Sequence, residues 1–436
     1  MGRNAKTGHL EVAMNGFEVG RWTRRSGGGQ EFVYKDAWLN QRAAIPVSLS
    51  MPLSPHPYSG DVVWNFFDNL LPDNAQIRTR LQGRLGTPSS RPFDLLSSMG
   101  GDCVGAVQIY PPSDAPPDVR NIVASPVDDA WIGATLRGYQ EQPLGIRSDD
   151  DFRISIAGAQ EKTALLWHQE TWQRPTGATP TSHIFKLPIG PLANGIDLTD
   201  SVENEWLCMR IAAAFGLPVA NTEMRTFDGA RALVVERFDR EWSSDRSWLI
   251  RKPQEDMCQA LGVSPGNKYE VDGGPGFREA FELLQQTRDP DRDRRTLFRT
   301  MVVFWLLAAT DGHAKNFSLL LLQGGRCEFA PLYDILSAHP AVAAKQVRVD
   351  KLKMAMAVSD KNRNYNWGKI RPRHLLAMAK RARFPEADAQ AILADVVARG
   401  PSVIAAVRAA LPDDFPAHVA DAILDGVAGA LKDAMV

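Results

Sequence analysis

Residues 310–316 have the sequence Thr-Asp-Gly-His-Ala-Lys-Asn, and residues 330–334 have the sequence Ala-Pro-Leu-Tyr-Asp. Asp311, Asn316 and Asp334 are of the types, and at the spacing, that kinases use for phosphoryl transfer. We expect Asp311 to orient the acceptor hydroxyl, and Asn316 and Asp334 to hold Mg²⁺ against the phosphates of ATP. Taken alone, an aspartate and an asparagine at this spacing more often form a polar turn after a buried helix. The rest of the chain must therefore decide between the two interpretations.

The segments around this motif predict a buried helix and a two-stranded ribbon. Residues 301–309 are apolar on every side, as expected of a buried helix that delivers a catalytic loop. Residues 317–322 form an apolar run, residues 323–326 have the composition of a turn, and residues 327–333 return toward Asp334. Such a ribbon would bring both proposed metal ligands to one edge of a cleft.

A candidate phosphate loop lies in residues 153–166, where alternating apolar residues flank the small turn Ala157-Gly158-Ala159. Lys162 follows the turn and would reach a phosphate from its far side. Because the turn contains a single glycine, it is a weaker signal than a GxGxxG loop.

A candidate strand lysine lies in residues 183–188, His-Ile-Phe-Lys-Leu-Pro, where Lys186 shares a face with an isoleucine. Lysines are rarely buried unpaired, so this pattern alone favours a solvated position at a strand edge over burial against an anion. Residues 201–215 predict a helix capped by its first residue, a serine. Glu205, or less favourably Glu203, would pair with Lys186 and hold it on the nucleotide.

Residues 231–240 predict an apolar strand that runs into a charged tetrad. In a two-lobed kinase the backbone after such a strand is the hinge that contacts adenine, which would place Glu236 and Phe238 there. The alternative is a strand end with ordinary surface charge.

Together these segments resemble the HipA family, the serine/threonine kinases that act as toxins of type II toxin–antitoxin pairs. Six motifs occur in the family's order, at residues 156–166, 183–190, 235–240, 253–262, 309–318 and 331–334. Further similarity at residues 64–73, 92–96 and 372–374 extends the resemblance over nearly the whole chain.

The resemblance implies an α+β, two-lobed, protein-kinase-like fold. Its N-terminal part would be β-rich and begin with a small β module, and its C-terminal lobe would be all helical. The implied domains are residues 1–112, 113–253 and 254–436. The implied roles are catalysis for Asp311; metal binding for Asn316 and Asp334; ATP binding for Ala157, Gly158, Ala159, Lys162, Lys186, Glu236, Phe238 and His313; and autophosphorylation for Ser155. A phosphate on Ser155 would exclude ATP phosphates and switch the enzyme off.

The resemblance also implies partners. These are a HipB-like helix-turn-helix antitoxin dimer, operator DNA that the pair corepresses, and a protein substrate, glutamyl-tRNA synthetase. Residues 361–383 contain eight Lys or Arg residues and no Asp or Glu, a pattern that is most often a solvated face. By resemblance, Lys380, Arg381 and Arg383 would contact the DNA backbone, which gives salt-dependent affinity without base specificity.

Composition is consistent with this assignment. A length of 436 residues predicts two or three domains, and a net charge of -1 predicts no nucleic-acid partner from bulk charge. The four cysteines show no metal-binding or disulfide spacing and predict reduced core thiols. The N-terminus lacks the apolar core of a signal peptide, and no apolar run approaches a membrane span. We therefore expect a cytoplasmic protein without a membrane partner.

Outside the motifs, the pattern predicts a hairpin at residues 10–22 with a type I′ turn at Asn15-Gly16. Short helices are expected at residues 61–71 and 92–98. Gly400-Pro401 is expected to separate two helices, and the last helix shows one apolar face formed by Val419, Ile423, Val427 and Leu431.

Two other functions stay open from the residues. A small-molecule or lipid kinase would share the metal-binding residues but needs an enclosed acceptor pocket. A non-catalytic corepressor would keep ATP as a structural ligand.

Overall fold

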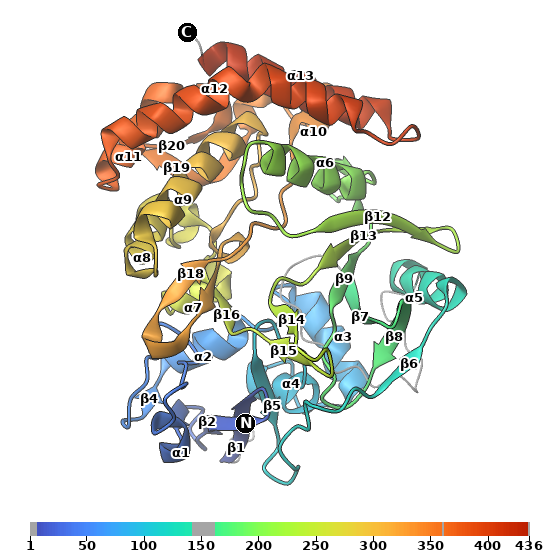
Figure 1. The fold of residues 1–436 in the computed structure, drawn as a ribbon, viewed down its shortest axis with the longest axis vertical. Helices are drawn as coiled ribbons and strands as arrows, with labels where there is room; N and C mark the ends of the chain where they lie inside the picture. The colour runs from blue at the N-terminus through green and yellow to red at the C-terminus, as the bar shows by residue number, and fades with distance from the viewer. Residues whose placement is uncertain (1–6, 142–161, 360–361, 435–436) are drawn as a thin grey trace.

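The computed structural model describes residues 7–141, 162–359 and 362–434. These residues form an N-terminal module, a sheet lobe and a helical lobe, with the N-terminal module at one end of the molecule and α12 and α13 at the other (Figure 1). Three hydrophobic clusters correspond to the three parts, and the helix α6 belongs to the cluster of the helical lobe.

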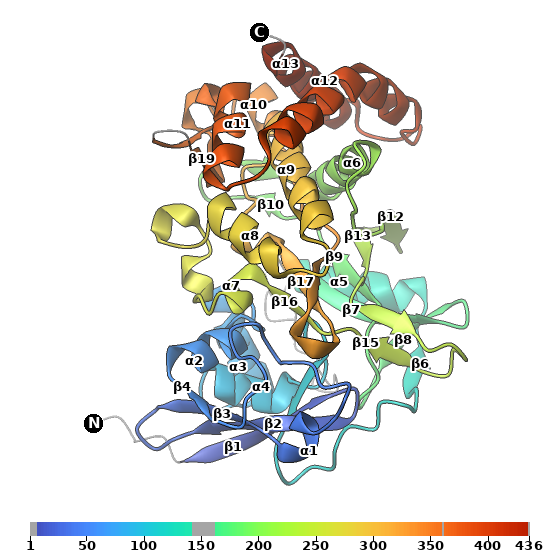
Figure 2. The ribbon, with the colours of Figure 1, turned by 60° about the vertical axis from the view of Figure 1, so that its left-hand side comes forward.

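The N-terminal module is an antiparallel five-stranded sheet in the order β4-β3-β2-β1-β5. Helices α2 to α4 lie between this sheet and the rest of the chain (Figure 2). The predicted hairpin is confirmed, and its turn residues Asn15 and Gly16 have positive φ angles of 48° and 81°, as a type I′ turn requires. The elements are β1 Gly8–Met14, β2 Phe17–Arg24, β3 Gln30–Tyr34, α1 Asp36–Leu39, β4 Tyr58–Ser59, α2 Asp61–Asp68, α3 Ala75–Leu85, α4 Pro92–Met99 and β5 Val107–Tyr110.

The helix α3 was not predicted, although its limits are encoded in the sequence. Asn74 caps its start by accepting hydrogen bonds from two backbone amides, and Gly86 ends it in the left-handed conformation. Its apolar periodicity is weak, and Leu81 is its buried residue, so the hydrophobic pattern gave little signal.

The sheet lobe is an antiparallel six-stranded sheet in the order β12-β13-β9-β7-β8-β6. Helix α5 packs on it over a small core that includes Ile132, Phe185 and Phe227. The elements are β6 Ala124–Pro126, α5 Asp129–Glu141, β7 Lys162–His168, β8 Thr171–Pro175, β9 His183–Lys186, β10 Gly190–Pro191, β11 Asp197–Leu198, α6 Ser201–Ala214, β12 Thr222–Phe227, β13 Ala230–Glu236, β14 Arg240–Trp242 and β15 Leu249–Arg251.

The predicted helix at residues 201–215 is confirmed as α6, but its capping residue was assigned wrongly. Asp200 occupies the N-cap position and makes no side-chain capping bond. The Ser201 hydroxyl instead accepts the backbone N–H of Ile189 at 2.9 Å. The serine therefore joins the helix to the segment after β9 and does not cap the helix.

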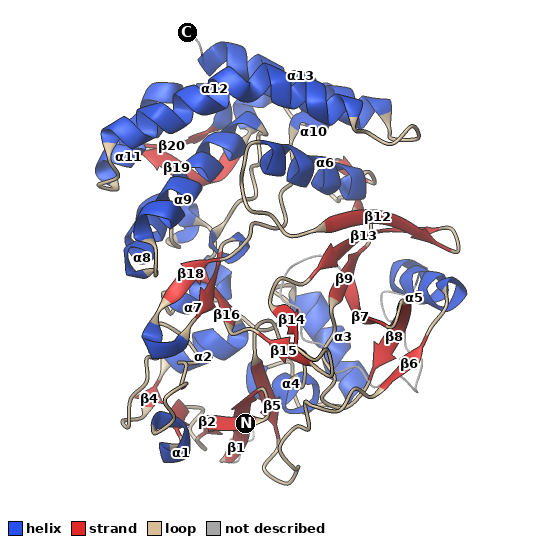
Figure 3. Ribbon diagram, in the orientation of Figure 1, coloured by secondary structure: helices blue, strands red, loops and turns tan. Residues whose placement is uncertain are grey.

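The helical lobe is mainly but not entirely helical (Figure 3), which corrects the prediction of an all-helical lobe. The ribbon predicted after the motif is present as β17 and β18, with β16 as a third strand, and β19 pairs with β20. Of the strands that were not predicted, β16 has the sequence Gln-Glu-Asp and β20 the sequence Arg-Asn-Tyr-Asn, so these two short, polar strands leave no apolar pattern. The elements are β16 Gln254–Asp256, α7 Met257–Ala260, α8 Phe277–Leu283, α9 Pro290–Leu306, β17 Ser318–Leu321, β18 Cys327–Phe329, α10 His339–Ala343, β19 Lys353–Ser359, β20 Arg363–Asn366, α11 Pro372–Arg381, α12 Glu386–Ala409 and α13 Ala417–Ala434.

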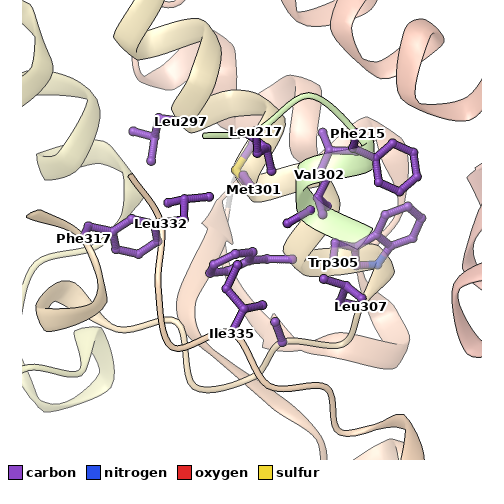
Figure 4. Close-up of a cluster of buried hydrophobic side chains, with 14 of the residues drawn as sticks. Phe215, Leu217, Leu297, Met301, Val302, Trp305, Leu307, Phe317, Leu332 and Ile335 are labelled. Atoms are coloured by element: carbon purple, nitrogen blue, oxygen red, sulfur yellow. The ribbon is translucent and has the colours of Figure 1, made fainter. Parts of the chain in front are cut away.

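The core of the helical lobe fixes the segment that carries Asp334. Leu332 precedes Asp334 and Ile335 follows it. Figure 4 shows both side chains in one cluster with Met301 and Trp305 of α9 and with Leu217, which follows α6. A backbone bridge between Val219 and Leu332 adds hydrogen bonds to this packing. The position of Asp334 is therefore set by the buried core beneath it.

The predicted break at Gly400-Pro401 is wrong, because α12 runs through both residues. Gly400 lies against Leu431 of α13, where a Cβ atom would collide with the leucine side chain. The glycine thus permits close packing of two helices. Pro401 removes one helical hydrogen bond, but Val396 and Val403 are buried on either side of it, and this packing keeps the helix continuous. The predicted apolar face of α13 is confirmed.

Among the described residues, α12 is long and apolar enough to span a membrane by length and composition. It packs against α9, α13, α6 and α11, as a core helix of a globular lobe does. The four cysteines are buried and free, which confirms the prediction of core thiols.

Glu255 joins the N-terminal module to the ribbon of the helical lobe and leads to a testable pH dependence. Its carboxylate accepts the Ser48 hydroxyl at 2.5 Å and the Leu49 N–H at 2.8 Å. Burial raises its pKa from 4.5 to about 8. Between these values the folded chain holds a proton that the unfolded chain releases, so we expect stability to fall as pH rises from 5 to 8. Melting temperatures across this range should show a smaller fall for Glu255→Gln, whereas equal profiles would contradict the prediction.

Candidate active site

The strand β9 delivers Lys186 into the space between the two lobes, where the ammonium is buried. Its Nζ atom lies 2.7 Å from Oε1 of Glu205 on α6 and 2.7 Å from Oδ1 of Asp334. Burial disfavours the charged lysine, but the two carboxylates outweigh it and raise the pKa of Lys186. The solvated position that the local pattern favoured is therefore excluded. Glu205 is the partner, while Glu203 pairs with Arg231.

Lys162 lies directly opposite Lys186 in the pairing of β7 with β9. Burial, and then the charge of Lys186, lower the pKa of Lys162 to about 8. Two neighbouring ammonium groups repel each other, and an anionic ligand between them would relieve that repulsion. The pair is therefore suited to the phosphates of a nucleotide.

Asn316 and Asp334 meet beneath this lysine pair. The Asn316 amide donates to Oδ2 of Asp334 at 3.2 Å, while Oδ1 of Asn316 is buried without a hydrogen-bond partner. Asp334 has a φ of 61°, a left-handed conformation that aspartate tolerates better than most residues. Oxygen donors of this kind suit Mg²⁺, which a few protein ligands hold together with phosphates and water. The residues present therefore fit the ion that the sequence predicts.

The metal site fits an ion that is bound jointly by the protein and a nucleotide better than an ion that is bound by protein side chains alone. Among the residues that the structure describes, no group of three His, Cys, Asp or Glu side chains could hold a metal ion. The Asn316 and Asp334 pair would thus need ligands from a bound nucleotide to complete the coordination shell.

Asp311 lies at the start of the same loop and is exposed. The Tyr269 hydroxyl donates to Oδ1 of Asp311 at 2.7 Å, and the Tyr269 ring meets His313 edge-on at 5.1 Å. Burial lowers the pKa of His313, which favours the neutral form of its imidazole. Residue 312, between Asp311 and His313, must be a glycine, because a Cβ atom there would lie 2.6 Å from the ring of Phe304. The loop therefore presents one carboxylate while its other side chains pack inward.

Lys315 supports this loop from below, and sequence reasoning assigned it no role. Its Nζ atom lies 2.7 Å from Oδ1 of Asn69 and 3.0 Å from Oδ2 of Asp256. Burial opposes its charge, but Asp256 and Asp73 outweigh that effect and raise the pKa of Lys315. Asn69 and Asp73 lie in the motif at residues 64–73, which carried family resemblance but no proposed chemistry. The N-terminal module thus holds the loop at residues 310–316 in place.

The predicted hinge is also held by the N-terminal module. The backbone of Glu236, at the end of β13, lies opposite that of His183 in the pairing of β13 with β9. Phe238 packs on Tyr333 with ring centroids 5.8 Å apart. The following charged residues are not ordinary surface charge. Arg237, Asp239 and Arg240 are buried and form a cluster of ion pairs with Arg251 and with Asp102 of the N-terminal module.

The remaining predicted residues lie elsewhere. Ser155, Ala157, Gly158 and Ala159 lie outside the described residues. Lys380 and Arg381 end α11, and Arg383 follows it in a left-handed conformation; all three are exposed. They are on the helical lobe and take no part in the cluster around Lys186.

Comparison with known proteins agrees with this geometry. A family model described as the HipA-like C-terminal domain matches residues 154–404, more than half of the chain. The HipA N-terminal domain model matches residues 10–110. The chain belongs to the HipA family.

Curated members of the HipA family resemble most of the chain. The putative kinase Y4mE of Sinorhizobium fredii is 37% identical over 352 residues, which cover 78% of this chain and 81% of the relative. The serine/threonine-protein kinase toxin HipA of Shewanella oneidensis is 28% identical over 75% of this chain and 73% of the relative. The chain is thus a HipA-like serine/threonine kinase of the toxin family.

The fold agrees as well. A solved complex of Shewanella oneidensis HipA, HipB and operator DNA superposes with a TM-score of 0.81. The match covers 98% of this chain and 97% of that one at 24% identity. The HipA-like two-lobed α+β fold is therefore confirmed, while the roles of individual site residues stay predictions.

Proposed function

We propose that this HipA-family kinase transfers the γ-phosphoryl group of ATP, with Mg²⁺, to a serine or threonine of a protein and thereby arrests growth. The observation that carries the proposal is Lys186, buried between Glu205 and Asp334 and placed opposite Lys162. Stability of the fold does not account for these two lysines, because burying paired charges rarely makes a protein more stable. A phosphate-binding role explains both.

The residues divide the reaction between them. The hydroxyl oxygen of the acceptor serine or threonine forms a bond to the γ-phosphorus, and Asp311 accepts the proton of that hydroxyl. The bond between the γ-phosphorus and the oxygen that bridges it to the β-phosphorus breaks, which releases ADP. Lys186 and Lys162 hold the phosphates, and the hinge backbone near Glu236 and Phe238 contacts adenine. Asn316 and Asp334 hold Mg²⁺, which neutralises charge on the phosphates when bound.

Two finer elements of the proposal rest on family resemblance. Ser155 is the proposed site of autophosphorylation, and a phosphate there would compete with the phosphates of ATP. Glutamyl-tRNA synthetase is the proposed substrate, and the compartment is the cytoplasm.

Labelled ATP added to a cell lysate with the purified chain tests the function. We expect label in protein and, by mass spectrometry, phosphate on Ser155. Label confined to lipids or small molecules would favour a small-molecule kinase. If no label were transferred, and if the variant Asp311→Ala arrested the growth of cells lacking the antitoxin as the wild-type chain does, a non-catalytic corepressor would be favoured.

We further propose that the chain binds a HipB-like antitoxin dimer and, with it, operator DNA. The HipA relative of the same fold was solved in such a complex. Lys380, Arg381 and Arg383 are exposed on one stretch of the helical lobe, as phosphate contacts require.

The DNA contact predicts a change in salt dependence. In the complex with antitoxin, the double variant Lys380→Gln/Arg383→Gln should lower the slope of log affinity against log salt by about 2, roughly one for each lost phosphate contact. Lys432→Gln, at an exposed lysine on α13, is the matched control. An unchanged slope in the double variant would remove these residues from the interface.

A further inference from the structure

A groove opens beside Asp311, and neither Lys186 nor Lys162 lines it. Its volume is about 740 Å³, and it extends from Thr310 and Asp311 to the loop between β10 and β11 and to the start of β19. Most of its lining is apolar. We define the apolar groove by Leu192, Ile196, Val271, Leu352 and Met354, with Tyr269 also in its lining.

The rim of this groove exposes large apolar side chains. Leu192 is 38% exposed and Val271 is 66% exposed. Single exposed apolar residues are ordinary, but two of them on the rim of one largely apolar hollow beside a catalytic carboxylate indicate a binding surface.

The hydroxyl group of Tyr269 connects the groove with Asp311. Tyr269 lines the groove, and its phenol donates to Asp311 at 2.7 Å. A hydroxyl that enters from the groove side can therefore reach the carboxylate at hydrogen-bond distance, as an acceptor serine or threonine must.

The charges around the groove argue against a polyanionic occupant. Asp197 and Asp200 line it together with Lys351 and Lys353. Because both signs are present, the field does not favour phosphates or nucleic acid. The mainly apolar wall instead favours an uncharged, bulky side chain.

We propose that the apolar groove binds the substrate segment that flanks the acceptor serine or threonine and selects bulky apolar side chains next to it. This inference rests on the proposed kinase function, because a kinase that acts on proteins must hold the residues beside the acceptor. The occupant is a segment of the substrate protein, and its apolar flank is the feature recognised.

The flanking preference can be measured on a mixture of peptides. A proteolytic digest of bacterial protein is incubated with the full chain, ATP and Mg²⁺, and the phosphorylated sites are sequenced. We expect Leu, Ile, Met or Phe near the acceptor, favoured about tenfold in kcat/KM over polar residues in matched synthetic peptides.

Variants then locate that preference. Leu192→Asp and Val271→Asp alter exposed positions, so the chain should fold; an unchanged rise in melting temperature with ATP and Mg²⁺ verifies this. We expect both to raise KM for the apolar peptide and to lose the tenfold preference. Val349→Asp is the matched control, because Val349 is 42% exposed and lies outside the groove.

Each other outcome overturns the inference. If both rim variants keep the preference, or if the wild-type chain labels intact protein but no peptide in the digest, the groove does not read local sequence, although the kinase assignment stands. If the variants instead lose inhibition by the antitoxin with peptide kinetics intact, the groove belongs to that partner. If the wild-type chain labels neither protein nor peptide, the proposed function itself fails.

Discussion

The substitution Asp311→Asn is expected to lower kcat for phosphoryl transfer by about 10²–10⁴-fold, the usual contribution of a positioned general base. Asparagine keeps an oxygen that can accept the Tyr269 hydroxyl, which now lies 2.7 Å from Oδ1. The loop should therefore keep its shape, and only the negative charge and the proton acceptor are lost. Steady-state transfer to protein and to Ser155 measures the effect.

Nucleotide binding separates this chemical effect from unfolding. Asp311 is not among the residues that surround Lys186, so the affinity for ATP and Mg²⁺ should stay within about twofold, because only transition-state stabilisation is removed. Asp272→Asn, at an exposed carboxylate close to Tyr269 in the sequence, should transfer phosphate like the wild-type chain. Full activity of Asp311→Asn would contradict the assignment of the catalytic residue.

Much of the site could be predicted from sequence because its residues lie in short motifs with fixed local structure. The buried helix α9, the ribbon of β17 and β18, and the strand β9 each follow from apolar patterning. These elements bring Asn316, Asp334 and Lys186 together as expected.

The local pattern failed where long-range contacts decide. It favoured a solvated Lys186, because the carboxylates that bury it come from α6 and from the segment after β18. Lys315 meets Asn69, which is 246 residues away, and Tyr269 meets Asp311 across 42 residues. Neither contact leaves a periodic signal, since a hydrogen bond between distant segments depends on tertiary packing.

The substitution Lys186→Met is expected to have two separate effects. Removing the ammonium leaves Glu205, whose side chain is 4% exposed, without its partner. Breaking a buried pair in this way typically costs about 3–5 kcal/mol, so the melting temperature without nucleotide should fall by several degrees. Transfer activity should also be lost, because the phosphates lose the cation that holds them.

The double variant Lys186→Met/Glu205→Gln distinguishes the two effects. With the buried carboxylate neutralised, most of the lost stability should return, because no uncompensated charge stays buried beside α6. Activity should not return, because a neutral pair cannot bind phosphate or direct Asp334 toward a metal ion. Calorimetry and a transfer assay on both variants measure this. Recovery of activity in the double variant would show that Lys186 serves only the fold, and would move the phosphate site to Lys162 alone.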